Sequence, residues 1–240
     1  MSYFFGATCN CPPTAVGVPA QIPDLQYWFE ADIGAANSTA GLVIPALQNS
    51  NPVSSYSPVQ VNAGAIRNAT NLNGKSVVDF AGSAANAYLF AGGGFLLGLV
   101  TTFVVFNPAA VGYGTFFAGP ASSCLEATIN PSLELELDLN GVATIGASTS
   151  AFTIGKWSQA NATYNSGTGA YAFRFARAAA GSGSNPRTIS SSTTSVGYNP
   201  SGSGGQYLNG ALGELIIYNR VLTATQITAV EGYLKTKWGV

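Results

Sequence analysis

Residues 133–139 read Leu-Glu-Leu-Glu-Leu-Asp-Leu, and this strict alternation constrains the fold more than any other stretch of the chain. Side chains of a β-strand point to opposite faces in turn, so the pattern predicts a half-buried strand. Its leucines would face the core, and Glu134, Glu136 and Asp138 would form a solvated or ligand-contacting face. Asn140-Gly141 follows, a pair that favours two-residue hairpin turns. The expected register pairs Leu139 with Val142, Leu137 with Thr144, Asp138 with Ala143, and Glu136 with Ile145.

Short segments rich in β-branched and aromatic residues recur along the chain, separated by Gly, Asn, Pro and Ser clusters. This pattern predicts an all-β fold in which two antiparallel sheets form a jelly-roll sandwich. Residues 180–206 are rich in Gly, Ser and Thr, and we expect them to form long surface loops around one short strand near 187–190. The other expected strands are 26–33, 76–80, 99–107, 113–118, 142–147, 157–164, 170–177 and 211–218.

The last residues predict a short amphipathic helix. Thr223 is a good N-cap, and Gln226 three residues later completes a capping box. One face of the helix is apolar at helical spacing. Lys235 and Lys237 lie in the last turn, where the helix dipole favours cations. The apolar face consists of Ile227, Val230, Leu234 and Trp238.

Charged side chains are scarce: the 240 residues include 9 basic and 10 acidic ones and no histidine, for a net charge of −1. The chain therefore lacks the basic surface that nucleic acids or anionic lipids require. No run of 18 apolar residues predicts a membrane-spanning helix. No Lys or Arg precedes the first apolar stretch, so we expect no secretory signal.

Residues 1–23 contain four prolines and no periodicity, and we expect them to form an extended arm in front of a domain that spans residues 24–240. The chain has three cysteines, Cys9, Cys11 and Cys124, and an odd number argues against a disulfide framework. No cofactor is predicted. A calcium ion would need converging oxygen ligands, and no loop has the required Asp and Asn spacing.

Four stretches in this order resemble the concanavalin A-like, laminin-G-like lectin/glucanase sandwich. The strongest is 208–223 (LNGALGELIIYNRVLT), which runs into the helix and is similar to the closing strand of that family. The others are 25–32, 73–80, and Ile154-Gly-Lys-Trp157 with Tyr164. The resemblance implies a concanavalin A-like jelly roll with a short C-terminal helix. Within it, we expect Trp28, Trp157 and Trp238 mainly as core residues, and Glu214 and Arg220 as a structural ion pair.

The same fold includes laminarinase-type glycoside hydrolases, whose catalytic strand has the form E-[ILV]-D-x-E. Glu134-Leu-Glu136-Leu-Asp138 is similar but has Glu in the middle and Asp at the end. A retaining site needs its two carboxyl groups about 5–5.5 Å apart, and a shorter last acid makes that distance harder to reach. We therefore expect no catalytic activity. The alternative is a glycoside hydrolase or polysaccharide lyase that uses these three acids.

The acidic strand has no cationic partner on its own hairpin, and Arg174 is the nearest candidate on another strand. We expect Glu134, Glu136, Asp138 and Arg174 to contact a ligand. A sandwich with an extended arm and little charge is similar to phage and viral surface modules, such as capsid decoration proteins, head fibres and tail-associated adhesins. The resemblance implies a virion-surface homo-oligomer that docks to other virion proteins through residues 1–23 and has a host glycan as its candidate ligand.

Overall fold

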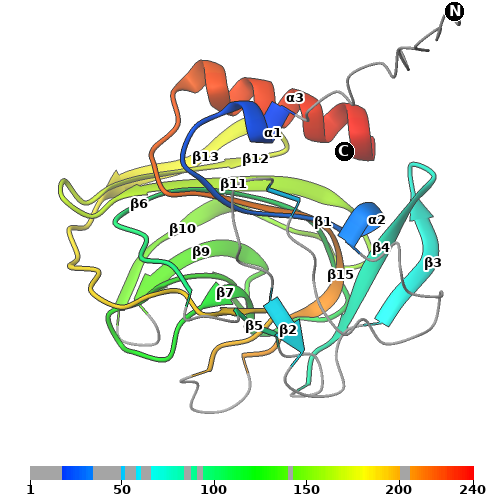
Figure 1. The fold of residues 1–240 in the computed structure, drawn as a ribbon, viewed down its shortest axis with the longest axis horizontal. Helices are drawn as coiled ribbons and strands as arrows, with labels where there is room; N and C mark the ends of the chain where they lie inside the picture. The colour runs from blue at the N-terminus through cyan, green and yellow to red at the C-terminus, as the bar shows by residue number, and fades with distance from the viewer. Residues whose placement is uncertain are drawn as a thin grey trace, which may run out of the picture.

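Two antiparallel sheets pack face to face, and a C-terminal helix covers the outer face of one of them (Figure 1). The computed structural model describes residues 18–34, 50–51, 58–60, 66–83, 88–90, 94–139, 143–200 and 206–240. The elements are α1 (Val18–Gln21), β1 (Leu25–Glu30), α2 (Ala31–Gly34), β2 (Pro58–Gln60), β3 (Ile66–Leu72), β4 (Lys75–Ala81), β5 (Tyr88–Phe90), β6 (Leu99–Pro108), β7 (Gly114–Ala118), β8 (Leu125–Ile129), β9 (Glu134–Leu139), β10 (Ala143–Ala151), β11 (Ser158–Asn165), β12 (Ala170–Phe175), β13 (Ala178–Ser184), β14 (Ser195–Val196), β15 (Asn209–Tyr218) and α3 (Ala224–Trp238).

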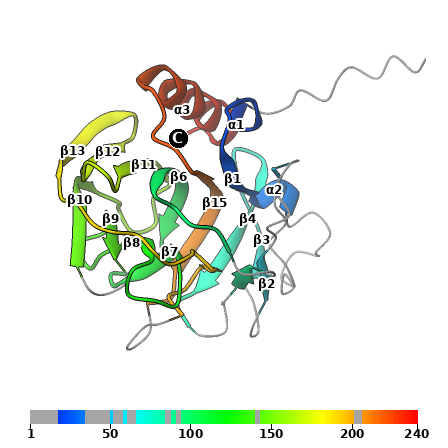
Figure 2. The same cartoon turned by 60° about the vertical axis from the view of Figure 1, so that its left-hand side comes forward.

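The strand order interleaves segments that are distant in sequence. Sheet A has eight strands in the order β13-β12-β11-β6-β15-β4-β3, with β1 also paired to β15. Sheet B has seven strands in the order β10-β9-β8-β7-β14-β5-β2. The two sheets curve around a common core, and Figure 2 shows them from the side. The predicted two-sheet antiparallel sandwich is confirmed.

Aromatic side chains join the two sheets in the core. Phe106 of β6 meets Phe116 of β7 edge to face, with ring centroids 5.1 Å apart. Phe152 follows β10 and packs against Phe106 at 5.9 Å and against Phe175 of β12 at 5.1 Å. Edge-to-face pairs at these separations stabilise a core beyond the area that they bury.

Helix α3 forms as its sequence predicts. The Thr223 hydroxyl accepts the Gln226 N–H at 3.3 Å, and the Gln226 side chain accepts the Thr223 N–H at 3.0 Å. Val230, Leu234 and Trp238 are buried against sheet A. The capping box and the apolar face are both confirmed.

A buried carboxylate joins the helix to sheet A. Glu214 of β15 is fully buried and accepts the indole N–H groups of Trp28 at 2.7 Å and Trp238 at 2.6 Å. The expected pair between Glu214 and Arg220 is wrong, because Arg220 lies 3.5 Å from Asp24 instead. Trp28 and Trp238 are core residues as expected.

Several segments differ from those expected. Strands β2, β3, β5 and β8 were not predicted. Strands β13 and β14 form within or beside the expected loop 180–206, whereas residues 187–190 form no strand. Residues 31–33 begin the short helix α2 rather than extending the first strand.

The end of the predicted arm belongs to the domain. Residues 1–17, with Cys9 and Cys11, lie outside the described residues. Residues 18–21 form the helical turn α1, where the Pro19 carbonyl accepts the Tyr218 hydroxyl at 3.0 Å, and Ile22 is buried in the core. Cys124 is a buried free thiol.

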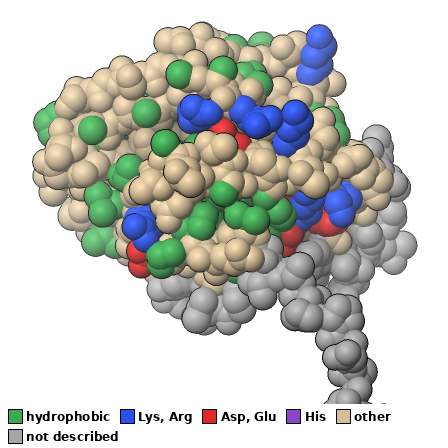
Figure 3. All heavy atoms as spheres, turned by 90° about the horizontal axis from the view of Figure 1, so that it is seen from above, with side chains coloured by type: hydrophobic (Ala, Val, Ile, Leu, Met, Phe, Trp, Pro, Cys, Tyr) green, Lys and Arg blue, Asp and Glu red, His purple; other side chains and the backbone are tan. Residues whose placement is uncertain are grey.

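Uncharged atoms form most of the surface on the side of α3, and the Lys, Arg, Asp and Glu side chains there occur in small groups (Figure 3). Among the described residues, no helix is long and apolar enough to cross a membrane.

Candidate functional site

The acidic strand forms, but its acids do not lie on an open face. Leu135, Leu137 and Leu139 are buried in the core, as predicted. On the opposite face Glu136 is only 7% exposed. Glu134 and Asp138 are half-buried. Folding has therefore desolvated a face that the alternation alone would leave in water.

The hairpin register differs from the expected one by one residue. Leu139 pairs with Ala143 and Asp138 with Thr144, which leaves three residues between the strands instead of two. The pairing also shifts between Thr144 and Gly146. The Asn140-Gly141 turn itself lies outside the described residues.

Glu126 on β8 belongs to the same acidic face, although the sequence did not indicate it as a site residue. It pairs directly with Asp138 across the two strands and is 1% exposed. Its carboxylate accepts the Thr115 hydroxyl at 2.9 Å and the Asn199 amide N–H at 3.0 Å. The pKa of Glu126 is raised to about 7, chiefly by burial and in addition by the charges of Asp138 and Glu136, while the two hydrogen bonds oppose the shift.

The signal for β8 was present in the sequence. Residues 125–129 read Leu-Glu-Ala-Thr-Ile, with Leu125, Ala127 and Ile129 in the core and Glu126 and Thr128 opposite. Five alternating residues between two turn-rich stretches are a short version of the β9 pattern.

The Asn130 side chain forms hydrogen bonds to two acids of β9, Glu134 and Glu136. Its amide nitrogen donates to Glu134 at 3.0 Å and to Glu136 at 3.0 Å. Glu136 also accepts the Thr144 hydroxyl at 2.9 Å. Burial and the charge of Glu136 raise the pKa of Asp138. We call Glu126, Glu134, Glu136 and Asp138 the carboxylate network.

Arg174 is not part of this network. It lies on β12 in sheet A and pairs with Glu231 of α3 at 2.7 Å, so its expected role as partner of the acids is wrong. The cation that acts on the network is Arg187, whose charge lowers the pKa of Asp138. No three acidic or cysteine side chains among the described residues converge to hold a metal ion.

The carboxylate network resembles a structural network more than an open catalytic site. Both oxygens of Glu126 and both oxygens of Glu136 accept hydrogen bonds from neighbouring side chains. Such bonds offset the cost of burying carboxyl groups. None of the three described pockets is lined by Glu126, Glu134, Glu136 or Asp138.

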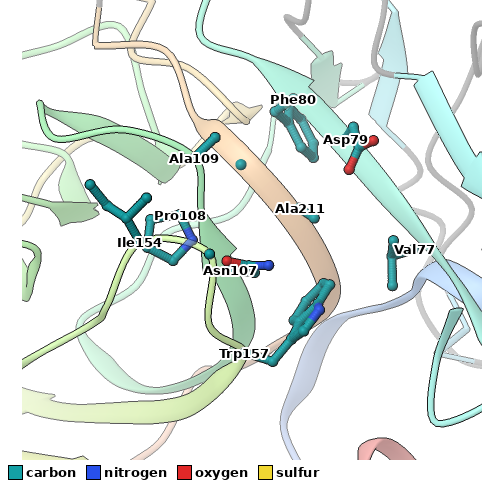
Figure 4. A pocket seen from close by; sticks show the side chains of 11 residues that line it. Val77, Asp79, Phe80, Asn107, Pro108, Ala109, Ile154, Trp157 and Ala211 are labelled. Atoms are coloured by element: carbon teal, nitrogen blue, oxygen red, sulfur yellow. The ribbon is translucent and has the colours of Figure 1, made fainter. Parts of the chain in front are cut away.

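A pocket with a volume of about 390 Å³ lies at one end of sheet A, and we call it the Trp157 pocket (Figure 4). The strand register places Asn107, Ala211 and Asp79 in one row across β6, β15 and β4, so their side chains share a face. Trp157 is half-buried beside this row, and Ile154 is 45% exposed. The full lining is Val77, Asp79, Phe80, Asn107, Pro108, Ala109, Ile154, Gly155, Trp157, Gly210 and Ala211.

The Trp157 pocket has an unused hydrogen-bond acceptor. The side-chain oxygen of Asn107 is buried and has no partner among the described residues. Backbone geometry holds the pocket walls, because Gly155 adopts a φ of 74° and donates its N–H to Pro108 at 3.0 Å. A side chain at Gly210 would come within 2.3 Å of the Asn107 carbonyl, so the wall requires glycine there.

Trp157 departs from the expectation that all three tryptophans serve mainly as core residues. It precedes β11 by one residue and therefore lies at the end of the sheet, where its ring contacts both the core and the pocket. An aromatic ring beside an unpaired amide oxygen is suited to a ligand with both apolar faces and hydroxyl groups.

A second pocket, with a volume of about 440 Å³, lies at the rim next to the first, and we call it the Tyr113 pocket. Tyr113 is 49% exposed and Val111 is 66% exposed. Tyr207 stacks against Tyr198 with ring centroids 6.2 Å apart. The lining is Gly82, Ala110, Val111, Gly112, Tyr113, Gly114, Ile129, Gln206, Tyr207 and Asn209.

The sequence of residues 100–228 matches the concanavalin A-like lectin/glucanases superfamily. No curated protein is significantly similar to the chain.

Solved structures share the fold at low sequence identity. Domain 4 of AbnA, an extracellular arabinanase from Geobacillus stearothermophilus in complex with arabinotriose, has a TM-score of 0.61 at 14% identity over 87% of this chain and 98% of that one. The Trypanosoma rangeli sialidase in complex with 2,3-difluoro-KDN has a TM-score of 0.58 at 10% identity over 90% of this chain, which spans 33% of the sialidase structure. A heptameric SAP-like pentraxin from Limulus polyphemus has a TM-score of 0.50 at 17% identity over 64% of this chain and 80% of that one. At these identities the similarity establishes the fold alone.

Proposed function

The chain belongs to the concanavalin A-like lectin/glucanase superfamily, and on this premise we propose that it is a non-catalytic carbohydrate-binding protein. The observation that carries the proposal is the Trp157 pocket, where a half-buried indole lies beside the unpaired amide oxygen of Asn107. A sugar ring would stack on the indole and donate a hydroxyl hydrogen to that oxygen, which pairs a buried acceptor that otherwise costs free energy.

The structural neighbours support a carbohydrate ligand. The structure of domain 4 of AbnA aligns with 87% of this chain and is a complex with arabinotriose. The proposal places the ligand at the Trp157 pocket rather than on the carboxylate network, whose oxygens already accept protein hydrogen bonds. It gives Arg174 a structural role instead of a ligand contact.

A glycan array tests this function. The protein is expected to bind glycans, and Trp157→Ala is expected to weaken binding strongly. Its thermal melt is measured alongside, because the indole also packs against the core. Val221→Ala removes an exposed apolar side chain at the opposite end of β15 and is expected to bind normally. Binding is expected to persist in EDTA, since the proposal involves no metal. A protein that binds no glycan, or a Trp157→Ala variant that binds as well as the original, would contradict the proposal.

The biological setting that we propose is a virion surface, where the sandwich faces outward and the part of the predicted arm before α1, residues 1–17, docks to neighbouring virion proteins in a homo-oligomeric assembly. The support is the proline-rich composition of this segment together with the low charge of the chain. Deletion of residues 1–17 leaves α1 in place and is expected to reduce incorporation into particles. Undiminished incorporation would reject the docking role.

A glycoside hydrolase is the second candidate, because Glu126 has a pKa raised to about 7 and directly opposes Asp138. A protonated acid beside an ionised one is the arrangement of a general acid and its partner. The assay incubates the protein with β-glucans, alginate and sulfated galactans and follows reducing ends and unsaturated products. We expect no release; cleavage that disappears in Glu126→Gln or Asp138→Asn would establish the enzyme instead.

A further inference from the structure

We propose that the binding site extends over both pockets and takes a neutral oligosaccharide, with one sugar unit in the Trp157 pocket and a further unit in the Tyr113 pocket. This inference rests on the proposed carbohydrate-binding function and adds the length and charge class of the ligand.

The two pockets adjoin because the same three chain segments line both. At the end of β4, Phe80 lines the first pocket and Gly82 the second. After β6, Ala109 lines the first and Ala110 the second. Adjacent residues are about 3.8 Å apart along the chain, so the boundary is narrow.

The third segment is the start of β15, where Gly210 lines the Trp157 pocket and Asn209 the Tyr113 pocket. The Ala109 N–H donates to the Asn209 carbonyl at 3.1 Å and fixes the two segments to each other. Ala109, Ala110 and Gly210 carry at most a methyl group. Of the six residues at the divider, Phe80 is buried and Asn209 is the one other side chain larger than a methyl group, so we expect a chain-like ligand to cross it.

The Tyr113 pocket has the groups that a second sugar unit would need. The half-exposed ring of Tyr113 lines this pocket together with Tyr207, which carries a hydroxyl group, and Asn209, which carries an amide. Gln206 is held in place by Asn199, whose amide nitrogen donates to its side-chain oxygen at 2.9 Å. Aromatic faces combined with fixed polar groups are typical of sites that orient a ligand.

The charge of the lining selects a neutral ligand. Among the described residues that line the two pockets, Asp79 is the one charged side chain, and none is Lys or Arg. Lys156 lies between Gly155 and Trp157 in sequence but is exposed and lines neither pocket. Carboxylate and sulfate groups are recognised by Arg or Lys, and neither residue type is among the described lining of the two pockets, so sialylated and sulfated sugars would find no cation there to bind.

The experiment measures the affinity of the full chain for gluco-, manno-, galacto- and arabino-oligosaccharides of one to six units, together with sialylated and sulfated counterparts. Affinity is expected to rise by about tenfold or more between one and three units, since each 1.4 kcal/mol of added contact gives a factor of ten. Tyr113→Ala is expected to remove this gain and leave single-sugar binding unchanged. Trp157→Ala is expected to weaken both, and Val221→Ala neither.

The outcomes separate the two proposals. If no member of any series binds, the carbohydrate-binding function fails and this inference fails with it. If single sugars bind as tightly as hexasaccharides, or Tyr113→Ala changes nothing, the second subsite is rejected and the function stands. If the sialylated or sulfated series binds as tightly as the neutral one, the neutral class is rejected. Thermal melts of each variant separate lost binding from lost folding.

Discussion

Glu126 and Asp138 lie directly opposite each other on neighbouring strands of sheet B, on the face away from the core. Two like charges in this position destabilise a sheet if both are ionised. The chain accommodates them by raising both pKa values, chiefly through burial, and by surrounding Glu126 with Thr115 and Asn199. The carboxylate network should therefore make stability depend on pH.

Stability is expected to fall as the pH rises from about 4.5 to about 7. The pKa of Glu126 is raised from 4.5 to about 7 in the folded chain, so the folded state holds a proton that the unfolded state releases in this interval. A displacement of this size amounts to roughly 3 kcal/mol in the free energy of unfolding. Thermal and urea melts at pH 5 and pH 8 should show the higher stability at pH 5.

Glu126→Gln is the variant that isolates this effect. The amide keeps the shape and cannot ionise, so the loss of stability between pH 5 and pH 8 is expected to shrink by about half rather than vanish. Glu214, also buried, has a pKa raised to about 7, and the pKa of Asp138 is raised as well, so these two groups supply the remainder. Glu134→Gln, on a half-buried acid of the same face, serves as the control. A pH dependence unchanged in Glu126→Gln would contradict the assignment.

Glu214 should be one of the residues least tolerant of substitution. It accepts two indole N–H groups and an ammonium group, from Trp28, Trp238 and Lys237. Glu214→Ala removes the acceptor of both indole N–H groups, while Lys237 keeps its ion pairs with Glu30 and Asp32, and the change is expected to destabilise the fold by about 3–5 kcal/mol. Glu214→Gln keeps one acceptor and should cost less. Urea denaturation measures both, and equal stability of Glu214→Ala and the original chain would refute the role.

Arg174 should matter for stability and not for ligand binding. Its guanidinium pairs with Glu231, which is 1% exposed and also accepts the Asn161 amide at 2.8 Å. Arg174→Ala leaves a buried carboxylate with less compensation, and a loss of about 1–3 kcal/mol is expected. Glycan affinity measured on the folded variant should be unchanged. A lowered affinity without a lowered melting temperature would return Arg174 to the binding site.

The helix cap gives a smaller and more local effect. Thr223→Ala removes the acceptor of the Gln226 N–H and is expected to cost about 1 kcal/mol, whereas Thr223→Ser keeps the hydroxyl and should be close to neutral. Chemical denaturation distinguishes the two variants. If both lose the same stability, the methyl group rather than the cap is responsible.

The sequence predicts well those strands and helices whose pattern lies entirely within a few consecutive residues. Residues 134–139 of the alternating stretch form β9, whereas Leu133 precedes it with a φ of 63°. The capping box of Thr223 and Gln226 forms as expected. Strand β8 has only five alternating residues between turn-rich segments, and the hairpin register depends on a loop length that Asn-Gly does not fix by itself. The prediction failed at both places. It also missed the strands β2, β3 and β5, and it expected loops where β13 and β14 form.

The candidate site was less predictable, because it depends on contacts between distant segments. Alternation places Glu136 on the face opposite the leucines but cannot show that Asn130 and Thr144 will enclose it. Likewise Trp157 has the composition of a core residue, and only the position of its strand end exposes one side of the ring to a pocket. The sequence also favours Arg174 as the partner of the acids, whereas in the fold Arg174 pairs with Glu231 and the charge of Arg187 acts on Asp138.

The walls of the Trp157 pocket are fixed by main-chain hydrogen bonds, from Ala109 to Asn209 and from Gly155 to Pro108. Such bonds place little demand on which side chains occupy the non-glycine lining positions. New residues at Ala109, Ala211 or Ile154 could thus change which ligand is recognised without rebuilding the sheets. The scaffold separates the evolution of specificity from the maintenance of the fold, and the same separation is available to protein engineering.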